Sequence, residues 1–255
     1  EPASLYPYGT LSSAAREVLA AVYDGPVDIY GYSYHPVILE KLPSLDDGDA
    51  IIETVSVYIG DEVSDAAGNP VTLQVGVRIR PAGCRSDDCA LVYDGVGTVD
   101  MDQMVVNFSL LPTLLWSDGT PLTAEDSIYS YTVAADPETI GSKYLFERTQ
   151  LYEATDEQSV QWWGKPGFID PTYFTNFWMP LPQHIWQDFT ASDLPDADVA
   201  SVFPTGWGPY MIDSWMPGDY VRLSRNPNYF RADEGLPYFD ELVYRFAPDP
   251  DQAIS

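Results

Sequence analysis

The sequence predicts a mixed α/β protein, because helix signals and strand signals alternate along it. Apolar residues at helical spacing follow Ser12 and Ser13, either of which can cap a helix. The pattern Thr123-Ala-Glu-Asp126 is typical of a capping box and predicts a second helix that runs to about residue 135. Three runs rich in valine, isoleucine and aromatic residues are typical of strands: 51–59, 71–79 and 103–110.

The first helix is expected after an extended, proline-containing segment at 1–8. Its apolar side chains recur at spacings of three and four residues: Ala15, Val18, Leu19 and Val22. The turn sequence at 24–26 ends this helix, and aromatic, β-prone residues follow at 29–34. A turn-rich break at 43–48 then marks an expected subdomain boundary.

Later elements are expected from the same kinds of signal. The helix that begins at Thr123 is expected to bury a stripe of side chains: Ile128, Tyr131 and Ala135. A short helix is expected near 182–186, before a polar surface loop over 190–205. Two paired strands and a third, alternating strand are expected near the end of the chain: 210–215, 220–225 and 242–246.

Residues 80–100 are expected to form a hairpin whose loop contains Cys84 and Cys89. A disulfide across the neck of this loop fits an oxidising compartment, with two free thiols as the open alternative. A metal site would need two further ligands of suitable type nearby, and the sequence offers none. The two histidines, His35 and His184, are far apart in the sequence, so no metal and no cofactor is expected.

Charge is the largest compositional signal. The 255-residue chain has a net charge of −27, which excludes nucleic acid and anionic membrane surfaces as partners. The charge indicates either a solvated surface on an exported protein or a cleft that attracts cationic ligands. No apolar run is long enough to span a membrane, and residue 1 is polar, so any signal peptide or lipid-anchor segment is expected to have been removed.

No enzyme class is indicated. The sequence contains no Gly-x-Ser-x-Gly elbow, no His-Glu-x-x-His pattern and no phosphate-cradling loop that ends in Gly-Lys. Carboxylates are too numerous for a glycosidase pair to be singled out.

Several motifs, in this order and spacing, resemble the family 5 extracellular solute-binding proteins. They are Trp116-Ser-Asp-Gly-Thr-Pro-Leu-Thr-Ala-Glu-Asp126, Pro180-Leu-Pro-Gln-His-Ile-Trp186, Pro204-Thr-Gly-Trp-Gly-Pro-Tyr210, Arg225-Asn-Pro-Asn-Tyr229 and Gly235-Leu-Pro-Tyr-Phe-Asp240. The chain departs from the family pattern at three places: the strand before the first motif lacks the usual Arg or Lys, Trp207 stands where the family has Thr, and 71–100 resembles an insertion.

This resemblance implies a class II periplasmic-binding fold, in which two α/β lobes close on a ligand. Residues 1–43 and 171–255 would then form part of the first lobe, 44–170 a β-rich accessory subdomain, and the second lobe would be missing. The implied protein is the extracytoplasmic, monomeric partner of an ABC permease, either free or lipid-anchored, and it captures peptides. An oligosaccharide receptor of the same family, a sensor domain, and a secreted carbohydrate-active enzyme or its binding module are the alternatives.

The resemblance also implies the first-lobe ligand contacts. The extended segment before the first helix would contact the ligand, and a peptide could pair with its backbone as an added strand. This segment consists of Glu1, Pro2, Ala3 and Ser4. The alternative is that it forms a frayed terminus without ligand contact. Trp207 and Gly208 are the other candidates, and a structural role in the core is the alternative for both.

Overall fold

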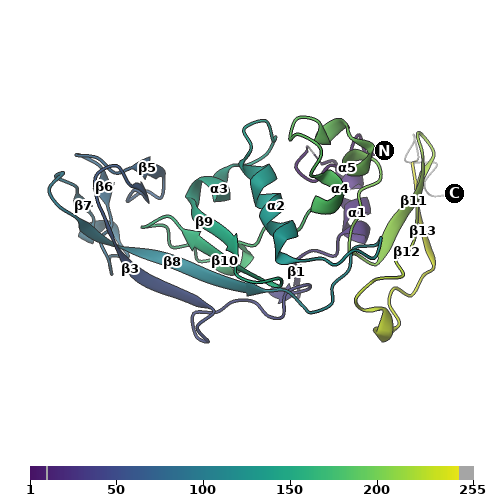
Figure 1. Ribbon diagram of the computed structural model, residues 1–255, viewed down its shortest axis with the longest axis horizontal. Helices are drawn as coiled ribbons and strands as arrows, with labels where there is room; N and C mark the ends of the chain where they lie inside the picture. The colour runs from purple at the N-terminus through teal and green to yellow at the C-terminus, as the bar shows by residue number, and fades with distance from the viewer. Residues whose placement is uncertain (10, 247–255) are drawn as a thin grey trace. The chain divides into compact units, whose positions relative to one another are not determined.

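The computed structural model describes residues 1–9 and 11–246, and the chain divides into two units (Figure 1). Unit 1 consists of three segments: Glu1–Ile38, Leu110–Gly141 and Met179–Ser255. Unit 2 consists of the two segments between them: Leu39–Ser109 and Ser142–Trp178. The expected boundaries at 43 and 171 lie near two of these borders, whereas the segment Leu110–Gly141, expected in the accessory subdomain, has its contacts in unit 1. The assignment of the units to a lobe and a subdomain stays a prediction.

Unit 1 begins with the expected helix, α1 (Ser13–Val22). Ser12 is its N-cap, since the Ser12 Oγ accepts a hydrogen bond of 3.1 Å from the Ala15 N–H. The predicted apolar stripe is confirmed, because Ala15, Val18, Leu19 and Val22 are all buried. The helix packs against strand β11, which lies far away in the sequence.

The three strands that the C-terminal sequence predicts form one antiparallel sheet in unit 1. Their order is β11 (Tyr210–Met216), β12 (Tyr220–Arg225) and β13 (Glu241–Arg245). The central strand alternates as expected, since Val221 and Leu223 are fully buried while their neighbours are half-buried. The expected strand at 242–246 corresponds to β13, which ends at Arg245.

Helix α2 (Ala124–Ala135) has the predicted bounds, but the predicted buried stripe is wrong. Ile128, Tyr131 and Ala135 are only half-buried, whereas Ser127, Ser130, Val133 and Ala134 are buried. The buried face is rotated because polar side chains along the helix bond to residues that are distant in the sequence. Ser130, for example, lies with its Oγ 2.7 Å from the Tyr8 Oη.

The remaining elements of unit 1 are short. They are the hairpin strands β1 (Val27–Tyr30) and β2 (Ser33–Pro36), helices α4 (Gln183–Trp186) and α5 (Asp198–Ser201), and the 3₁₀ turns η3 (Leu194–Asp196) and η4 (Ala232–Glu234). One apolar cluster joins α2, α4 and α5 to the N-terminal segment: Tyr6, Val133, Leu181, Trp186, Leu194 and Ala200. The N-terminal segment is therefore part of the core of unit 1 and is not frayed at Tyr6.

Unit 2 is built on an antiparallel sheet of four strands. Their order is β3 (Ala50–Val57), β8 (Val99–Ser109), β10 (Ser159–Gly164) and β9 (Thr149–Ala154). The central strand β8 is buried from residue 101 to residue 106, and this stretch includes the polar residues Asp102 and Gln103. Helix α3 (Tyr144–Arg148) precedes β9, and a 3₁₀ turn, η2 (Tyr173–Thr175), follows the sheet.

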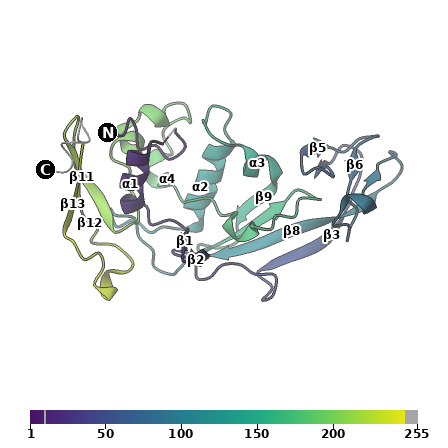
Figure 2. The ribbon, with the colours of Figure 1, turned by 180° about the vertical axis from the view of Figure 1, so that it is seen from behind.

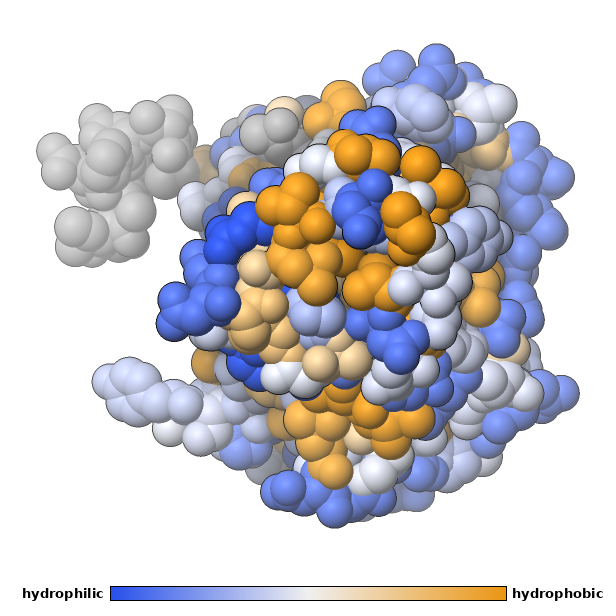
Figure 3. Space-filling model, turned by 90° about the vertical axis from the view of Figure 1, so that its left-hand side faces the viewer, coloured by the Kyte–Doolittle hydropathy of each residue, from blue (hydrophilic) through white to orange (hydrophobic). Residues whose placement is uncertain are grey.

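The predicted strand over 71–79 is wrong, because the chain turns within it. The segment forms β5 (Pro70–Thr72), which pairs with β4 (Glu62–Ser64), and then β6 (Arg78–Ile79), which pairs with β7 (Leu91–Val92). Gly76 adopts a φ of +92°, a left-handed conformation that interrupts a strand and that glycine adopts readily. Figure 3 views the end of the unit that carries β5, β6 and β7, where apolar and polar patches lie side by side.

The predicted hairpin and disulfide are confirmed. Cys84 and Cys89 are bonded, with their Cα atoms 5.7 Å apart, and a 3₁₀ turn, η1 (Asp87–Cys89), lies inside the loop. One apolar cluster includes Ile79 of the hairpin and Tyr93, which follows it. The members of this cluster are Val57, Val63, Leu73, Ile79, Tyr93 and Met101.

Removal of this disulfide is expected to destabilise the protein moderately. A six-residue loop loses little entropy when it closes, so replacing both Cys84 and Cys89 by serine is expected to lower the free energy of unfolding by about 2 kcal/mol. Urea denaturation of the variant and of the wild type measures this difference. The wild type in reducing agent is the control and is expected to match the variant; equal midpoints for variant and oxidised wild type would contradict the prediction.

No helix within residues 1–9 and 11–246 combines the length and the hydropathy that crossing a membrane requires.

Candidate ligand-binding site

The first family motif forms a turn that leads into α2, as the sequence predicts. The Gly119 N–H donates to the Trp116 carbonyl at 2.9 Å, and Gly119 adopts a φ of +88° that favours glycine. Leu115 and Pro121 then form an isolated bridge that closes the turn. The motif therefore places the N-terminus of α2 at a fixed position in unit 1.

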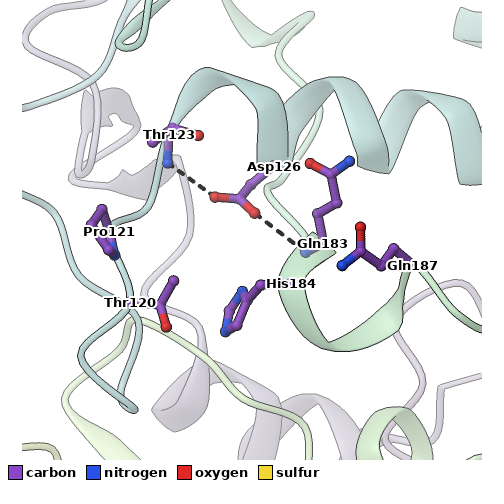
Figure 4. Close-up of a pocket in the computed structure, with 7 residues that line it drawn as sticks. All are labelled: Thr120, Pro121, Thr123, Asp126, Gln183, His184 and Gln187. Carbon is purple, nitrogen blue, oxygen red and sulfur yellow. Dashed lines mark hydrogen bonds between the residues drawn. The ribbon is translucent and has the colours of Figure 1, made fainter.

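Asp126 links the first family motif to the second. Its Oδ2 accepts hydrogen bonds from the Thr123 N–H at 3.0 Å and from the Trp116 Nε1–H at 3.2 Å. Its Oδ1 accepts one from the Gln183 N–H at 3.3 Å (Figure 4). Its carbonyl accepts one from the Leu181 N–H at 3.1 Å. Burial raises the pKa of the Asp126 carboxyl, although these hydrogen bonds oppose the rise.

A polar pocket lies beside Asp126, with a volume of about 300 Å³ (Figure 4). Its lining comes from both motifs: Thr120, Pro121, Thr123, Asp126, Gln183, His184 and Gln187. At its edge the His184 Nε2 lies 2.8 Å from the Asp118 Oδ2. Burial opposes ionisation of Asp118, but the Thr120 N–H and His184 outweigh it and hold the pKa of that carboxyl below its usual value. The two titratable side chains of the lining, Asp126 and His184, both bond to other groups of the protein, which favours a structural role.

The third motif places Trp207 and Gly208 inside unit 1. Trp207 is 1% exposed, and its Nε1–H donates to the Asp24 carbonyl at 2.8 Å. A Cβ at Gly208 would lie 2.6 Å from the Val22 carbonyl oxygen, so this glycine allows two backbones to approach closely. These contacts favour the core alternative for both residues, and ligand contact by Trp207 and Gly208 stays a prediction.

Asp24 forms hydrogen bonds through its backbone carbonyl and through its carboxylate. The carbonyl bonds to the third motif, and the carboxylate bonds to a residue that follows this motif. In addition to the Trp207 contact, its Oδ2 accepts a hydrogen bond of 2.5 Å from the Tyr229 Oη–H. Burial raises the pKa of the Asp24 carboxyl, while the Tyr229 hydroxyl opposes the rise.

Stability is expected to depend on pH through Asp24. Because its pKa is raised in the folded protein, the folded state holds a proton more tightly than the unfolded state, and this stabilisation is lost as pH rises above the usual carboxyl pKa. The wild type is therefore expected to lose stability relative to Asp24→Asn as pH rises from about 4 toward 7. Urea midpoints across this range test the prediction, with Asp213→Asn, at an exposed position of β11, as the control; parallel curves for wild type and Asp24→Asn would contradict it.

A second pocket, of about 310 Å³, involves the N-terminal candidates. Its lining residues are Glu1, Pro2, Ala3, Val202, Phe203, Trp215 and Pro217. The sequence candidates Glu1, Pro2 and Ala3 thus lie together at one pocket, whereas Ser4 is not part of its lining. Sequence reasoning missed Val202, Phe203, Trp215 and Pro217; the aromatic residues were the only signal, because nothing local links them to residue 1.

The Glu1 side chain is held in place at this pocket. Its Oε1 accepts a hydrogen bond of 3.0 Å from the Trp215 Nε1–H, and its Oε2 accepts one of 3.0 Å from the Gly218 N–H. Further along, the Leu5 N–H donates to the Ser201 carbonyl at 2.8 Å. The segment is therefore anchored to β11, to the turn after it and to α5. We call this site, with its apolar wall of Val202, Phe203 and Trp215, the N-terminal pocket.

Metal ligation is not indicated in the part of the chain that the structure describes, where no three residues among histidine, cysteine, aspartate and glutamate are grouped for a metal ion.

Comparison with known proteins reveals similarity to one family of binding proteins. The profile of the bacterial extracellular solute-binding proteins, family 5 Middle, matches residues 90–255. The oligopeptide-binding protein AppA of Bacillus subtilis (strain 168) is 23% identical over 248 residues, which cover 96% of this chain and 41% of the relative. The solved structure of AppA from Bacillus subtilis in complex with a nonapeptide has a TM-score of 0.67 at 19% identity, and the match covers 99% of this chain and 39% of that one.

A further solved structure shares the fold but was determined with a different ligand. NikZ from Campylobacter jejuni, in complex with Ni(L-His), has a TM-score of 0.63 at 17% identity, and the match covers all of this chain and 39% of that one. The fold alone therefore does not define the ligand.

The fold and the motifs define a solute-binding protein of the periplasmic-binding type, and the relatives that the chain matches are binding proteins and not enzymes. The family profile covers more than half of the chain, and the chain belongs to family 5 of the bacterial extracellular solute-binding proteins. The resemblance that the motifs indicate is thereby confirmed. The chain spans about two fifths of the length of the relatives that it matches.

Proposed function

We propose that this chain is part of an extracytoplasmic receptor that captures peptides and delivers them to the permease of an ABC importer. The observation that supports it most strongly is the similarity to the oligopeptide-binding protein AppA along 248 residues, nearly the whole chain. The receptor acts as a monomer and carries no cofactor.

The N-terminal pocket is our proposed contribution of this chain to peptide binding. Its apolar wall and its volume of about 310 Å³ suit an apolar peptide side chain, which would bury Val202, Phe203 and Trp215 further. Glu1 keeps its carboxylate engaged with Trp215 and the turn, so it positions the wall and leaves the pocket interior apolar. Trp207 and Gly208 contribute by supporting this lobe from inside.

The function is tested on the full-length protein with a pool of short peptides. A clear rise in Tm with the peptide pool, and none with a pool of oligosaccharides, is the expected result. A rise with oligosaccharides alone would replace peptides by sugars as the ligand class. Residues 1–255 alone are expected to bind weakly, because a two-lobed receptor buries its ligand from both sides.

The site is tested separately by substitution of Phe203, which is 44% exposed at the pocket wall. Phe203→Ala is expected to weaken peptide binding about tenfold in calorimetry. Phe189→Ala is the matched control, since Phe189 is 39% exposed but lies outside the pocket. Unchanged affinity in Phe203→Ala, together with peptide binding by the wild type, would reject the pocket and leave the peptide receptor intact.

A further inference from the structure

The negative charge of this chain far exceeds what its own basic residues balance. Aspartate and glutamate number 39 and lysine and arginine only 12, of which three are lysines: Lys41, Lys143 and Lys165. Solubility alone calls for a net charge of about 2–8 in a small domain, and the net charge here is −27. An excess of this size opposes the compact state, because folding brings like charges closer together.

The basic residues are also unevenly distributed along the chain. Between Arg85 and Lys143 there are ten acidic residues and no lysine or arginine. Between Lys165 and Arg222 there are seven acidic residues and again no lysine or arginine. Each of these two stretches contributes to both units. Repulsion between carboxylates therefore acts within unit 1 and within unit 2.

Nearly all of these carboxylates lie at the surface. Asp102 and Asp126 are the only acidic residues that are buried among those that the structure describes. Others, such as Asp188 and Asp196, are exposed and have no ion-pair partner within residues 1–9 and 11–246. The surface of the folded chain, and not its interior, therefore carries the excess charge.

The ion pairs that the chain does form compensate weakly. The side chains of Arg245 and Asp219 are 76% and 59% exposed and their charged atoms lie 3.7 Å apart, so water screens the attraction. Lys41 is also exposed, and two carboxylates share it, those of Asp47 and Asp49. Pairs of this kind contribute little to stability, and none of them changes the total charge.

Dissolved cations can supply the missing positive charge, provided that they are concentrated. Asp196 and Asp198 are two positions apart in the sequence, which keeps their carboxylates within roughly 10 Å of each other. The screening length of salt is about 10 Å at 0.1 M, which leaves such pairs in repulsion, and about 3 Å at 1 M, which removes most of it. Dilute salt is therefore insufficient for this surface.

We infer that the folded state of this chain requires monovalent salt in the molar range. Cations that gather at the acidic surface take the place of the missing lysine and arginine side chains, and the fold loosens in both units when these cations are diluted. The acidic surface does not serve to attract cationic ligands from a distance, because the same salt screens that attraction. The inference holds whichever ligand the protein captures.

The test is hydrogen exchange, measured by mass spectrometry on the ligand-free full-length protein in about 0.15 M and in about 2 M KCl. The reporters are peptides from β8 and β12, because each is an internal strand of the sheet in its unit (Figure 2). Exchange of both strands is expected to be at least about tenfold faster in the dilute salt, where the carboxylates repel one another. Peptides from these strands report on this chain directly, whatever charge the rest of the protein carries.

A sucrose sample separates charge from burial. Sucrose at about 1 M favours burial of apolar surface but carries no charge, so it is added to the protein in dilute salt. It is expected to restore little of the lost protection. Full restoration by sucrose would overturn the inference, because weak burial and not repulsion would then limit the fold. Equal exchange rates in dilute and concentrated KCl would overturn it as well.

Charge variants of the full-length protein give a second test, with effects of opposite sign. Neutralising four exposed carboxylates is expected to raise the Tm by about 5 °C in dilute KCl and to leave it unchanged in about 2 M KCl. The four substitutions are Glu153→Gln, Glu157→Gln, Asp188→Asn and Asp196→Asn. Arg16→Gln removes an exposed positive charge from α1 and is expected to lower the Tm in dilute KCl alone. Any other pattern would overturn the inference.

Discussion

Replacing Asp126 by alanine is expected to lower the free energy of unfolding by about 3–5 kcal/mol. The substitution removes the acceptor for three donors: the Trp116 indole N–H and the backbone N–H groups of Thr123 and Gln183. Trp116 is fully buried, so water does not replace the lost acceptor at its indole. The capping box of α2 is lost as well, and the connection between the first and second family motifs breaks.

Urea denaturation measures this loss, and the neighbouring residue supplies the control. Glu125 lies in the same first turn of α2 but is exposed, so Glu125→Ala is expected to change stability by less than about 0.5 kcal/mol. Asp126→Asn is expected to fall between the two, because its side-chain oxygen still accepts hydrogen bonds but its amide faces donors. Similar midpoints for Asp126→Ala and Glu125→Ala would show that the carboxylate does not hold the motifs together.

The substitution Gly206→Ala is expected to prevent the native packing of the third motif, at a cost of more than about 3 kcal/mol. A Cβ at this position would lie 2.0 Å from the Val22 carbonyl oxygen and 2.6 Å from the Val22 Cγ1. The obstacle is backbone, which cannot rotate away as a side chain can. The Gly206 carbonyl also accepts a hydrogen bond of 2.8 Å from the Ser117 N–H, so a displaced Gly206 would disturb the first motif too.

A second glycine separates this steric effect from a general cost of removing glycine. Gly218 has a φ of +78°, and a Cβ added there would meet no other atom within 4 Å, so Gly218→Ala is expected to cost only about 1–2 kcal/mol of backbone strain. Thermal denaturation followed by circular dichroism compares the two variants. If Gly206→Ala unfolds at the same temperature as Gly218→Ala, the close approach to Val22 is not what requires the glycine.

Elements that depend on neighbouring residues could be predicted from the sequence. The capping residues Ser12 and Thr123 fix the starts of α1 and α2 through contacts within one helical turn, so local patterns locate both helices. The disulfide joins residues only five positions apart, and the expected compartment supports its oxidation. The first family motif was recognisable for a related reason, since it contains its own turn and the cap of α2.

Features that depend on distant contacts could not be predicted. The stripe of α2 is rotated because Asp126 and Ser130 bond to residues far away in the sequence, and helical periodicity does not register such bonds. Gly76 interrupts the expected strand over 71–79, although the valines in this run predict one uninterrupted strand. The N-terminal pocket combines residues 1–3 with Phe203 and Trp215, a juxtaposition that only the folded chain reveals.

Unit 1 is assembled from three separated stretches of the polypeptide, and this interleaving has a consequence for biosynthesis. Helix α1 packs on β11, and Glu1 bonds to Trp215, so the beginning of the chain must wait for partners that are synthesised much later. Both segments of unit 2 end before residue 179, so unit 2 can form earlier. A nascent chain would therefore hold the segment around Glu1 and α1 without these partners for much of its synthesis.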